Sequence, residues 1–335
     1  MDKLKRYIST ENIAGIIFFI FVFTLPFYSN AYKIQNFANF YVTVLLALSL
    51  CLVWGYSGIF SFGQAAFMGI GAYTYSITII ASENTVLAII MAIVVPLLAA
   101  LLIGYFIFYG GIGDNFVALI TLCIATALET FMIQTSDSKW KIAGVALGGY
   151  NGINSVPSMH FGDIKIKGEL YYFVMVFIIL TVYLFLKATA HSSWGYALFG
   201  VRENKERSAM FGYNTRFLQT SVFAASGALA GLAGCLFSAG QNYVVPTTCG
   251  TDSSILAIVM VATAGRKNPT AVVILTLFYS WFSQRLAGNG AVYGDLLLGA
   301  ILVIVVLFIP DGVLATGFEK IDECIAGLKK KALSK

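Results

Sequence analysis

Charged residues are scarce in this sequence, and their scarcity excludes an ordinary soluble domain. Only 11% of the 335 residues are Asp, Glu, Lys or Arg, whereas 59% are hydrophobic. A soluble domain carries about 25% charged residues. The mean hydropathy of +0.83 agrees with this comparison, so we expect an integral membrane protein.

Residues that build catalytic and metal sites are also scarce. There are only two histidines, His160 and His191, and the spacing of the five cysteines matches neither a zinc site nor a disulfide framework. The dipeptide Gly-Lys does not occur, so the chain lacks a Gly-x-x-x-x-Gly-Lys-Ser/Thr phosphate loop. Because no cluster typical of an active site gathers in one segment, we expect no enzyme activity, metal or cofactor in this chain.

Long apolar segments are what the sequence does have. A helix needs about 20 apolar residues to cross a bilayer, and the chain offers ten candidates. They are residues 13–28, 37–54, 64–80, 85–108, 116–134, 170–187, 217–239, 253–264, 270–286 and 294–310. The third and the eighth are Gly-rich or short, which is typical of broken or re-entrant helices. We predict an all-α membrane protein of about ten helices, with residues 1–335 as one domain.

The basic residues predict the orientation. With the N-terminus inside, 15 of the 21 Lys and Arg fall in inside segments, as the positive-inside rule requires. Both termini, including a tail over 311–335, are therefore expected in the cytoplasm. The net charge of +5 follows from this topology and does not indicate nucleic-acid binding. A cleaved signal peptide is the alternative for the N-terminus, but the first apolar run is long for one.

Two long polar segments separate the predicted spans. Residues 135–169 form an outside loop containing "LGGYNGINSVP", and residues 188–216 form an inside loop containing "ENKERSAMFG". In the second, Asn204 is expected to cap a short helix and Gly212 to end it. A helix this short is not stable alone. It therefore packs either on the protein's own inner surface or in a groove on a cytoplasmic partner.

Three segments together resemble a known family of transport proteins. They are "GYSGIFSFGQAAFMGIGAY", "LGGYNGINSVP" and "WGYALFGVRENKERSAMFGYNTRFLQTSVFAASGALAGLAG". In this order and spacing they look like the permease subunits of ABC importers for branched-chain amino acids, and their relatives for urea and short amides. The resemblance runs from about Val42 to Leu314. One departure is the connection "YGGIGDN" at 109–115, which lacks the arginines that family members often carry there.

The resemblance implies a fold and a set of partners. It implies a type II-like importer fold in the cytoplasmic membrane of a bacterium or archaeon, a second homologous permease, two cytoplasmic ATPase subunits that bind ATP and Mg, and an extracytoplasmic binding protein. It also implies that the inside helix couples the permease to the ATPase. The implied coupling residues are Arg202, Glu203, Asn204, Lys205, Glu206, Arg207, Met210 and Phe211.

Four polar residues are candidates for the translocation pathway. Gln64 follows a Gly-rich break, and broken spans present polar groups to solute in transporters. Glu129 lies in the fifth predicted span, where a carboxylate is costly and usually faces water or the protein interior. Thr121 and Thr126 share that span, and Thr126 is expected on the same face as Glu129. The alternatives are close packing for the glycines and a position near the outer end for Glu129.

An ABC permease for branched-chain amino acids is the function we expect from the resemblance. Gln64, where amino-acid members often have histidine, and "FGY" at 211–213 favour the urea branch instead. An ion-coupled carrier is the alternative of another class, but such carriers often bury several ionisable residues. This chain offers little beyond Glu129. "SGALAGLAG" in the seventh span is expected to serve helix packing, because small residues recur at four-residue spacing.

Overall fold

The computed structural model describes residues 10–137, 139–162, 164–288, 312–318 and 320–323. The predicted tenth span, 294–310, lies outside them, as does most of the predicted tail. The helices are α2 (Thr10–Thr24), η1 (Leu25–Tyr28), α3 (Ala31–Leu50), the π-helix η2 (Cys51–Tyr56), α4 (Gln64–Ser82), α5 (Thr85–Tyr109), α6 (Asp114–Gln134), η3 (Gly149–Asn151), α7 (Glu169–Ala190), α8 (Ser193–Glu203), α9 (Lys205–Met210), α10 (Thr215–Gln241), η4 (Pro246–Cys249), α11 (Thr251–Ala264) and α12 (Pro269–Gly288). The strands are β1 (Lys141–Ile142), β2 (Val145–Ala146), β3 (Ile153–Asn154), β4 (His160–Phe161), β5 (Ile164–Lys165) and β6 (Tyr243–Val244).

Seven of the described helices are long and apolar enough to cross a membrane. These spans are 10–28, 31–56, 64–82, 85–109, 114–134, 169–190 and 215–241. The eighth and ninth predicted spans are also helical, as α11 and α12. With only 14 residues, α11 is about 21 Å long at 1.5 Å per residue, which is too short to cross the bilayer. The expectation of an all-α multi-pass protein is therefore confirmed, and the eighth predicted span is short as expected. The third predicted span is one continuous helix, α4, and the irregular backbone lies before it, at 57–63.

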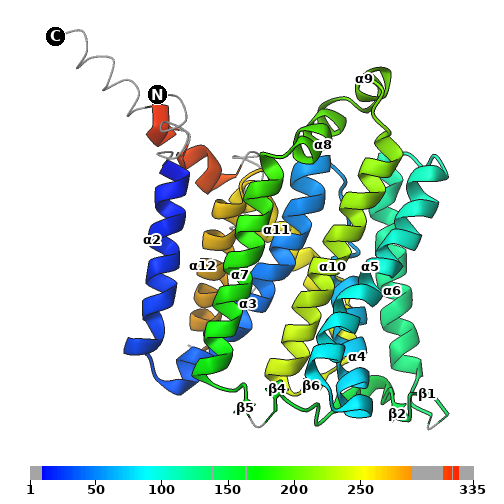
Figure 1. The fold of residues 1–335 in the computed structure, drawn as a ribbon, viewed down its shortest axis with the longest axis vertical. Coiled ribbons are helices and arrows are strands. Elements are labelled where there is room, and N and C mark those ends of the chain that lie inside the picture. The colour runs from blue at the N-terminus through cyan, green and yellow to red at the C-terminus, as the bar shows by residue number, and fades with distance from the viewer. Residues whose placement is uncertain (1–9, 138, 163, 289–311, 319, 324–335) are drawn as a thin grey trace.

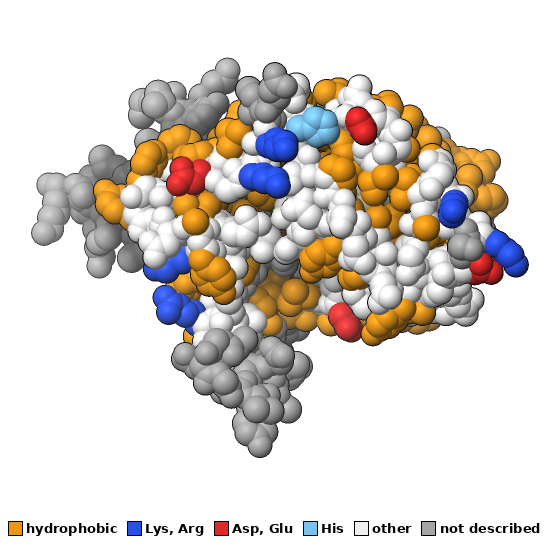
Figure 2. All heavy atoms as spheres, turned by 90° about the horizontal axis from the view of Figure 1, so that it is seen from below, with side chains coloured by type: hydrophobic (Ala, Val, Ile, Leu, Met, Phe, Trp, Pro, Cys, Tyr) orange, Lys and Arg blue, Asp and Glu red, His pale blue; other side chains and the backbone are white. Residues whose placement is uncertain are grey.

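The two long polar segments lie at opposite ends of the bundle. Helices α8 and α9 form one end, and strands β1 to β5 lie at the other, with the spans side by side between them (Figure 1). Figure 2 looks onto the strand end, where charged side chains of both signs are interspersed with apolar ones. Two loops on opposite sides of a membrane must lie at opposite ends of the bundle, as these two segments do.

Helix α10 packs directly against α4 and α5, and small residues allow the close approach. A Cβ atom added to Gly234 would lie 1.8 Å from the carbonyl oxygen of Met68, and one added to Gly227 would lie 2.4 Å from the Cβ of Ala100. Only glycine fits at such contacts, because the neighbouring helix occupies the space of a side chain. The packing role expected for "SGALAGLAG" is confirmed. Between helices in lipid, such van der Waals contact replaces the hydrophobic driving force.

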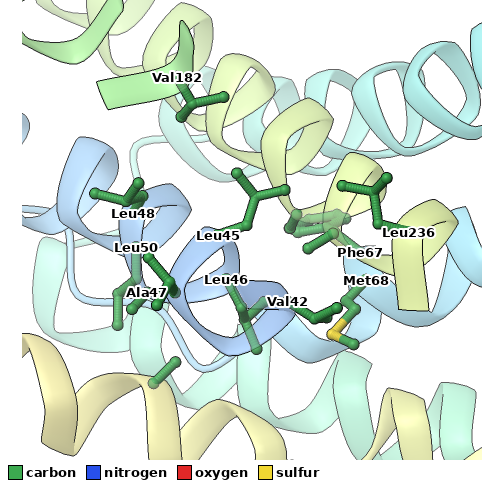
Figure 3. Packing of buried hydrophobic residues seen from close by; sticks show 14 of the residues in the cluster. Val42, Leu45, Leu46, Ala47, Leu48, Leu50, Phe67, Met68, Val182 and Leu236 are labelled. Carbon is green, nitrogen blue, oxygen red and sulfur yellow. The ribbon is translucent and has the colours of Figure 1, made fainter. Parts of the chain in front are cut away.

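Helix α3 lies in the interior of the bundle. Its side chains Val42 and Leu45 point toward Phe67 and Met68 of α4 and toward Leu236 of α10, and all five are buried (Figure 3). Because α3 is covered on several sides, the break that follows it is enclosed by protein. Irregular backbone is tolerated at membrane depth only in such a place or beside water.

The loop over 135–169 is folded onto the ends of the spans. Strands β1 and β2 pair with each other, as do β4 and β5, while β3 pairs with β6 directly after α10. The side-chain amide of Asn242 donates to the carbonyl of Val156 (2.8 Å). His160 Nε2 lies 3.0 Å from the carbonyl oxygen of Glu83, at the end of α4. These bonds join the loop to both α4 and α10.

Candidate functional site

The predicted break lies between η2 and α4, at residues 57–63. Its backbone groups are bonded by hydroxyls from distant helices. The amide of Phe62 donates to Thr121 Oγ1 of α6 (3.0 Å), and the amide of Ala65 donates to Ser254 Oγ of α11 (3.0 Å). Ser254 Oγ in turn donates to the carbonyl of Phe62 (2.6 Å). A break inside a bilayer needs such partners, because no lipid group can replace the lost helical bonds.

Two helices begin at this place. Gly63 precedes α4 and Gly250 precedes α11, and neither position supplies a side-chain cap. Ser254, in the first turn of α11, contacts both sides of the α4 start. Before α11, the 3-10 helix η4 packs against α4, and a Cβ added to Gly69 would lie 1.9 Å from Cys249 Sγ. The positive ends of two helix dipoles therefore lie close together within the membrane-spanning bundle.

Gln64 is the first residue of α4, and its side chain is 1% exposed. Its Oε1 lies 3.0 Å from Ser49 Oγ of α3 and 3.2 Å from Ser226 Oγ of α10, and each of these hydroxyls also lies within hydrogen-bond distance of a backbone carbonyl. Among the described residues, its Nε2 has no hydrogen-bond partner. A buried donor without a partner costs about 1–3 kcal/mol. Gln64 thus joins three helices at the break and keeps an unused amide.

The other three predicted pathway residues lie on α6 but do not share one environment. Thr121 is buried, and Glu129, two turns further along, is half-buried. A Cβ added to Gly250 would lie 2.9 Å from Glu129 Oε1, so this carboxylate lies at the N-terminal end of α11. A negative charge is favourable there. Thr126 lies on the exposed side instead, and its hydroxyl donates to the carbonyl of Leu122 (3.1 Å).

The exposed side of α6 carries a polar stripe. Thr126, Thr130 and Gln134 are spaced four residues apart, and all three are exposed. Residues at this spacing lie one above the other on a helix. Polar side chains in membrane spans usually face water, the bundle interior or another helix. The same helix also exposes Phe116, Leu119 and Phe131, so the stripe is a candidate contact for water or a second protein on an otherwise apolar surface.

The end of the bundle that carries α8 and α9 holds the predicted coupling residues. Asn204 caps α9 as expected, since its Oδ1 accepts from the amide of Arg207 (2.8 Å). Gly212 follows the helix with φ +86°, the left-handed conformation expected of it. Met210 is 85% exposed and Phe211 is 75% exposed. An apolar pair this exposed at a helix end is available to another protein.

The predicted coupling segment is two helices, because Asn204 separates α8 from α9. Arg202, at the end of α8, turns inward: its Nη1 donates to the carbonyl of Gly55 in η2, and its side chain is only 15% exposed. Its Nη2 donates to Glu203 Oε1 (2.9 Å), and this bond lowers the pKa of Glu203. Lys205 Nζ lies 3.1 Å from Asp114 Oδ1 at the start of α6. Glu206 and Arg207 are exposed.

The chain matches the model of one protein family over residues 34–306, and that family is described as "Branched-chain amino acid transport system / permease component". It is 23% identical to the high-affinity branched-chain amino acid transport system permease protein LivM of Escherichia coli, over 82% of this chain and 68% of the relative. It is also 23% identical to a probable branched-chain amino acid transport permease protein LivM of Methanocaldococcus jannaschii, over 70% of this chain and 75% of the relative. No solved structure shows a comparable match.

Proposed function

The chain belongs to the family of branched-chain amino acid transport permeases, and we propose that it forms the translocation pathway of an ATP-driven importer for these amino acids. A permease subunit of this kind is not itself an enzyme. Energy then has to come from partner ATPases, which bind the ATP and Mg. The proposed assembly also includes a second homologous permease and an extracytoplasmic binding protein.

One observation carries the proposed pathway: the starts of α4 and α11 meet beside α6. Transporters use the N-terminal ends of discontinuous helices to attract anionic groups of a solute. Glu129 places a carboxylate at the same junction. A free amino acid carries one carboxylate and one ammonium group. Glu129 can attract the ammonium group, and the start of α4 is the helix end left for the carboxylate. This arrangement supports an amino acid over urea, which is neutral.

The contacts of Gln64 in the structure give no support to the urea branch. Its side-chain amide lies within hydrogen-bond distance of two serine hydroxyls, one from α3 and one from α10. This use of the side chain supports a role in joining helices at the break. The relatives quoted above are all named for branched-chain amino acids.

The polar stripe of α6 supports a path shared with the second permease. Thr126 and Thr130 face away from this chain's own bundle. A second permease placed against α6 would enclose the stripe and keep it out of lipid. The path proposed here runs along α6, past Glu129 and the two helix starts.

Met210 and Phe211 support docking of an ATPase on α9. Helix α9 already packs against α8 and α10 of this chain, as a helix of six residues requires. Its two exposed apolar side chains are therefore left to contact another protein. We propose that this end is cytoplasmic, with the loop over 135–169 outside, as the distribution of Lys and Arg in the sequence supports.

Reconstituted transport tests the proposal. The chain would be placed in proteoliposomes with the partner permease, both ATPases and ATP inside, and uptake of labelled leucine, isoleucine, valine and urea measured with the binding protein outside. Leucine, isoleucine and valine should accumulate only when ATP is present. Accumulation of urea alone would contradict the proposed solute. Uptake driven by an ion gradient without ATP would contradict the importer.

A further inference from the structure

Arg202 connects the proposed docking end to the break in the membrane. Helix α8 lies over the end of α3 that continues into η2 (Figure 1). From the last turn of α8, the guanidinium of Arg202 donates to the carbonyl of Gly55. It also stacks over the ring of Phe199, at 5.2 Å from the ring centre. Phe199 contacts the ring of Tyr56, also in η2, at 5.2 Å between centres. Arg202 and Phe199 thus hold α8 against the π-helix.

The carbonyl that Arg202 binds has lost its helical partner. The chain leaves the helix after Tyr56, so the last carbonyls need other donors. Ser57 Oγ donates to the carbonyl of Val53 (2.6 Å), and the amide of Gly58 donates to that of Trp54 (3.1 Å). The carbonyl of Gly55 accepts from the guanidinium of Arg202. A cation is also favoured at the C-terminal end of a helix by the helix dipole.

The backbone at the start of the break lies directly against Arg202. Gly58 has φ +79°, a conformation that L side chains rarely adopt. A Cβ added there would lie 2.8 Å from the Cγ of Arg202. Backbone and arginine therefore lie in close contact at the first residues of the break. Because of this contact, a shift of α8 would press on the segment that leads to Gln64.

We propose that Arg202 is a positioning residue that transmits movement of the docked α8 and α9 to the break, and so to the starts of α4 and α11. This inference rests on the proposed function, because it needs an ATPase docked on α9. It differs from the role expected from the sequence, in which Arg202 contacts the ATPase. Arg202 faces the permease interior, and the contact surface is left to Met210 and Phe211.

A second link from α9 runs to α6 but is more exposed. Lys205 and Asp114 form an ion pair whose side chains are 36% and 52% exposed. Exposed pairs of long side chains are weak and are screened by salt. The side chain of Arg202 is less exposed than this pair, and its acceptor is a backbone carbonyl. We therefore assign the transmission to Arg202.

The test separates transmission from simple bracing. Arg202→Gln, Arg202→Lys and the control Arg216→Gln, at an exposed arginine at the start of α10, would be purified as complete transporters. ATPase content, ATP hydrolysis and leucine uptake would then be measured in proteoliposomes with loaded binding protein. Arg202→Gln should retain its ATPase subunits but consume at least tenfold more ATP per leucine. Arg202→Lys should lie between it and the wild type, because it keeps the charge but not the planar fork. Arg216→Gln should stay within twofold of the wild type.

Two results would overturn the inference. One is an unchanged ratio of ATP to leucine in both Arg202 variants. The other is loss of assembled transporter with a normal ratio in the remaining complexes, since that is the behaviour of a static brace. If Arg202→Gln does not assemble, the ratio measured for Arg202→Lys decides. Failure of the wild-type transporter to bind ATPases or import leucine would refute the proposed function instead, and is therefore distinguishable.

Discussion

Replacing both Met210 and Phe211 with alanine is expected to release the ATPase subunits and leave the permease folded. The two side chains are 85% and 75% exposed, so the permease gains little stability from them. Truncating an apolar anchor at the centre of an interface costs roughly 2 kcal/mol or more. Two such anchors would weaken association by a factor on the order of 10³, because each 1.4 kcal/mol is about tenfold.

The assay compares assembly with folding. Tagged permease would be solubilised and the amount of co-purified ATPase measured, with monodispersity and thermal unfolding as measures of the fold. Phe177→Ala is the matched control, because Phe177 is 69% exposed on the membrane span α7 and not on α9. The control should bind ATPase normally. Full ATPase recovery and normal leucine uptake in the double variant would refute the docking role of α9.

Three further changes test other parts of the account. Glu129→Gln should lower leucine uptake at least about tenfold with ATPase association intact, since a hydrogen bond to a charged group is worth about 1.5–3 kcal/mol; wild-type kinetics would leave Glu129 with a structural role only. Gly234→Val should lower the thermal stability of the detergent-solubilised permease, because its Cβ meets the Met68 carbonyl oxygen and overpacking costs about 1–3 kcal/mol; an unchanged melting temperature would contradict the packing. Single cysteines at Ser136 and Ala209 should react with impermeant reagents from outside and inside respectively, and the reverse pattern would overturn the orientation.

Local patterns in the sequence predicted the spans, the break and the α9 cap. Hydrophobic runs mark spans because side chains that face the hydrocarbon core of the bilayer must be mostly apolar. The glycines between Gly55 and Gly63 marked the break, and Asn204 marked the helix start, because each acts on backbone only a few residues away. Such signals need no knowledge of the tertiary structure.

Partners that are distant in the sequence could not be predicted in this way. Arg202 looked like a surface charge, but its acceptor, the carbonyl of Gly55, lies 147 residues earlier. Ser254, which bonds both sides of the α4 start, is 192 residues from Phe62 and resembles any other serine in a span. The close packing of Gly55 in η2 is also a tertiary feature, since a Cβ added there would lie 2.0 Å from the carbonyl oxygen of Arg266.

The exposure of Thr126 could not be predicted from the sequence for a related reason. Its spacing from Glu129 suggested a shared face, but a half-buried and an exposed residue can both lie within one turn of a helix. Only the packing of α6 against α4 and η4 decides which side of the helix is covered. Once the exposed side of α6 is known, the four-residue spacing of Thr126, Thr130 and Gln134 identifies the polar stripe on it.

Thiol accessibility at position 126 tests most directly whether the pathway runs along α6. In the assembled transporter, with native cysteines replaced, Thr126→Cys would be treated with a membrane-impermeant maleimide with and without ATP and loaded binding protein. Leu102→Cys, on the exposed side of α5, is the lipid-facing control. The account predicts that Thr126→Cys reacts faster than the control and that ATP and leucine change its rate. Equal, slow labelling of both positions in every condition would contradict it.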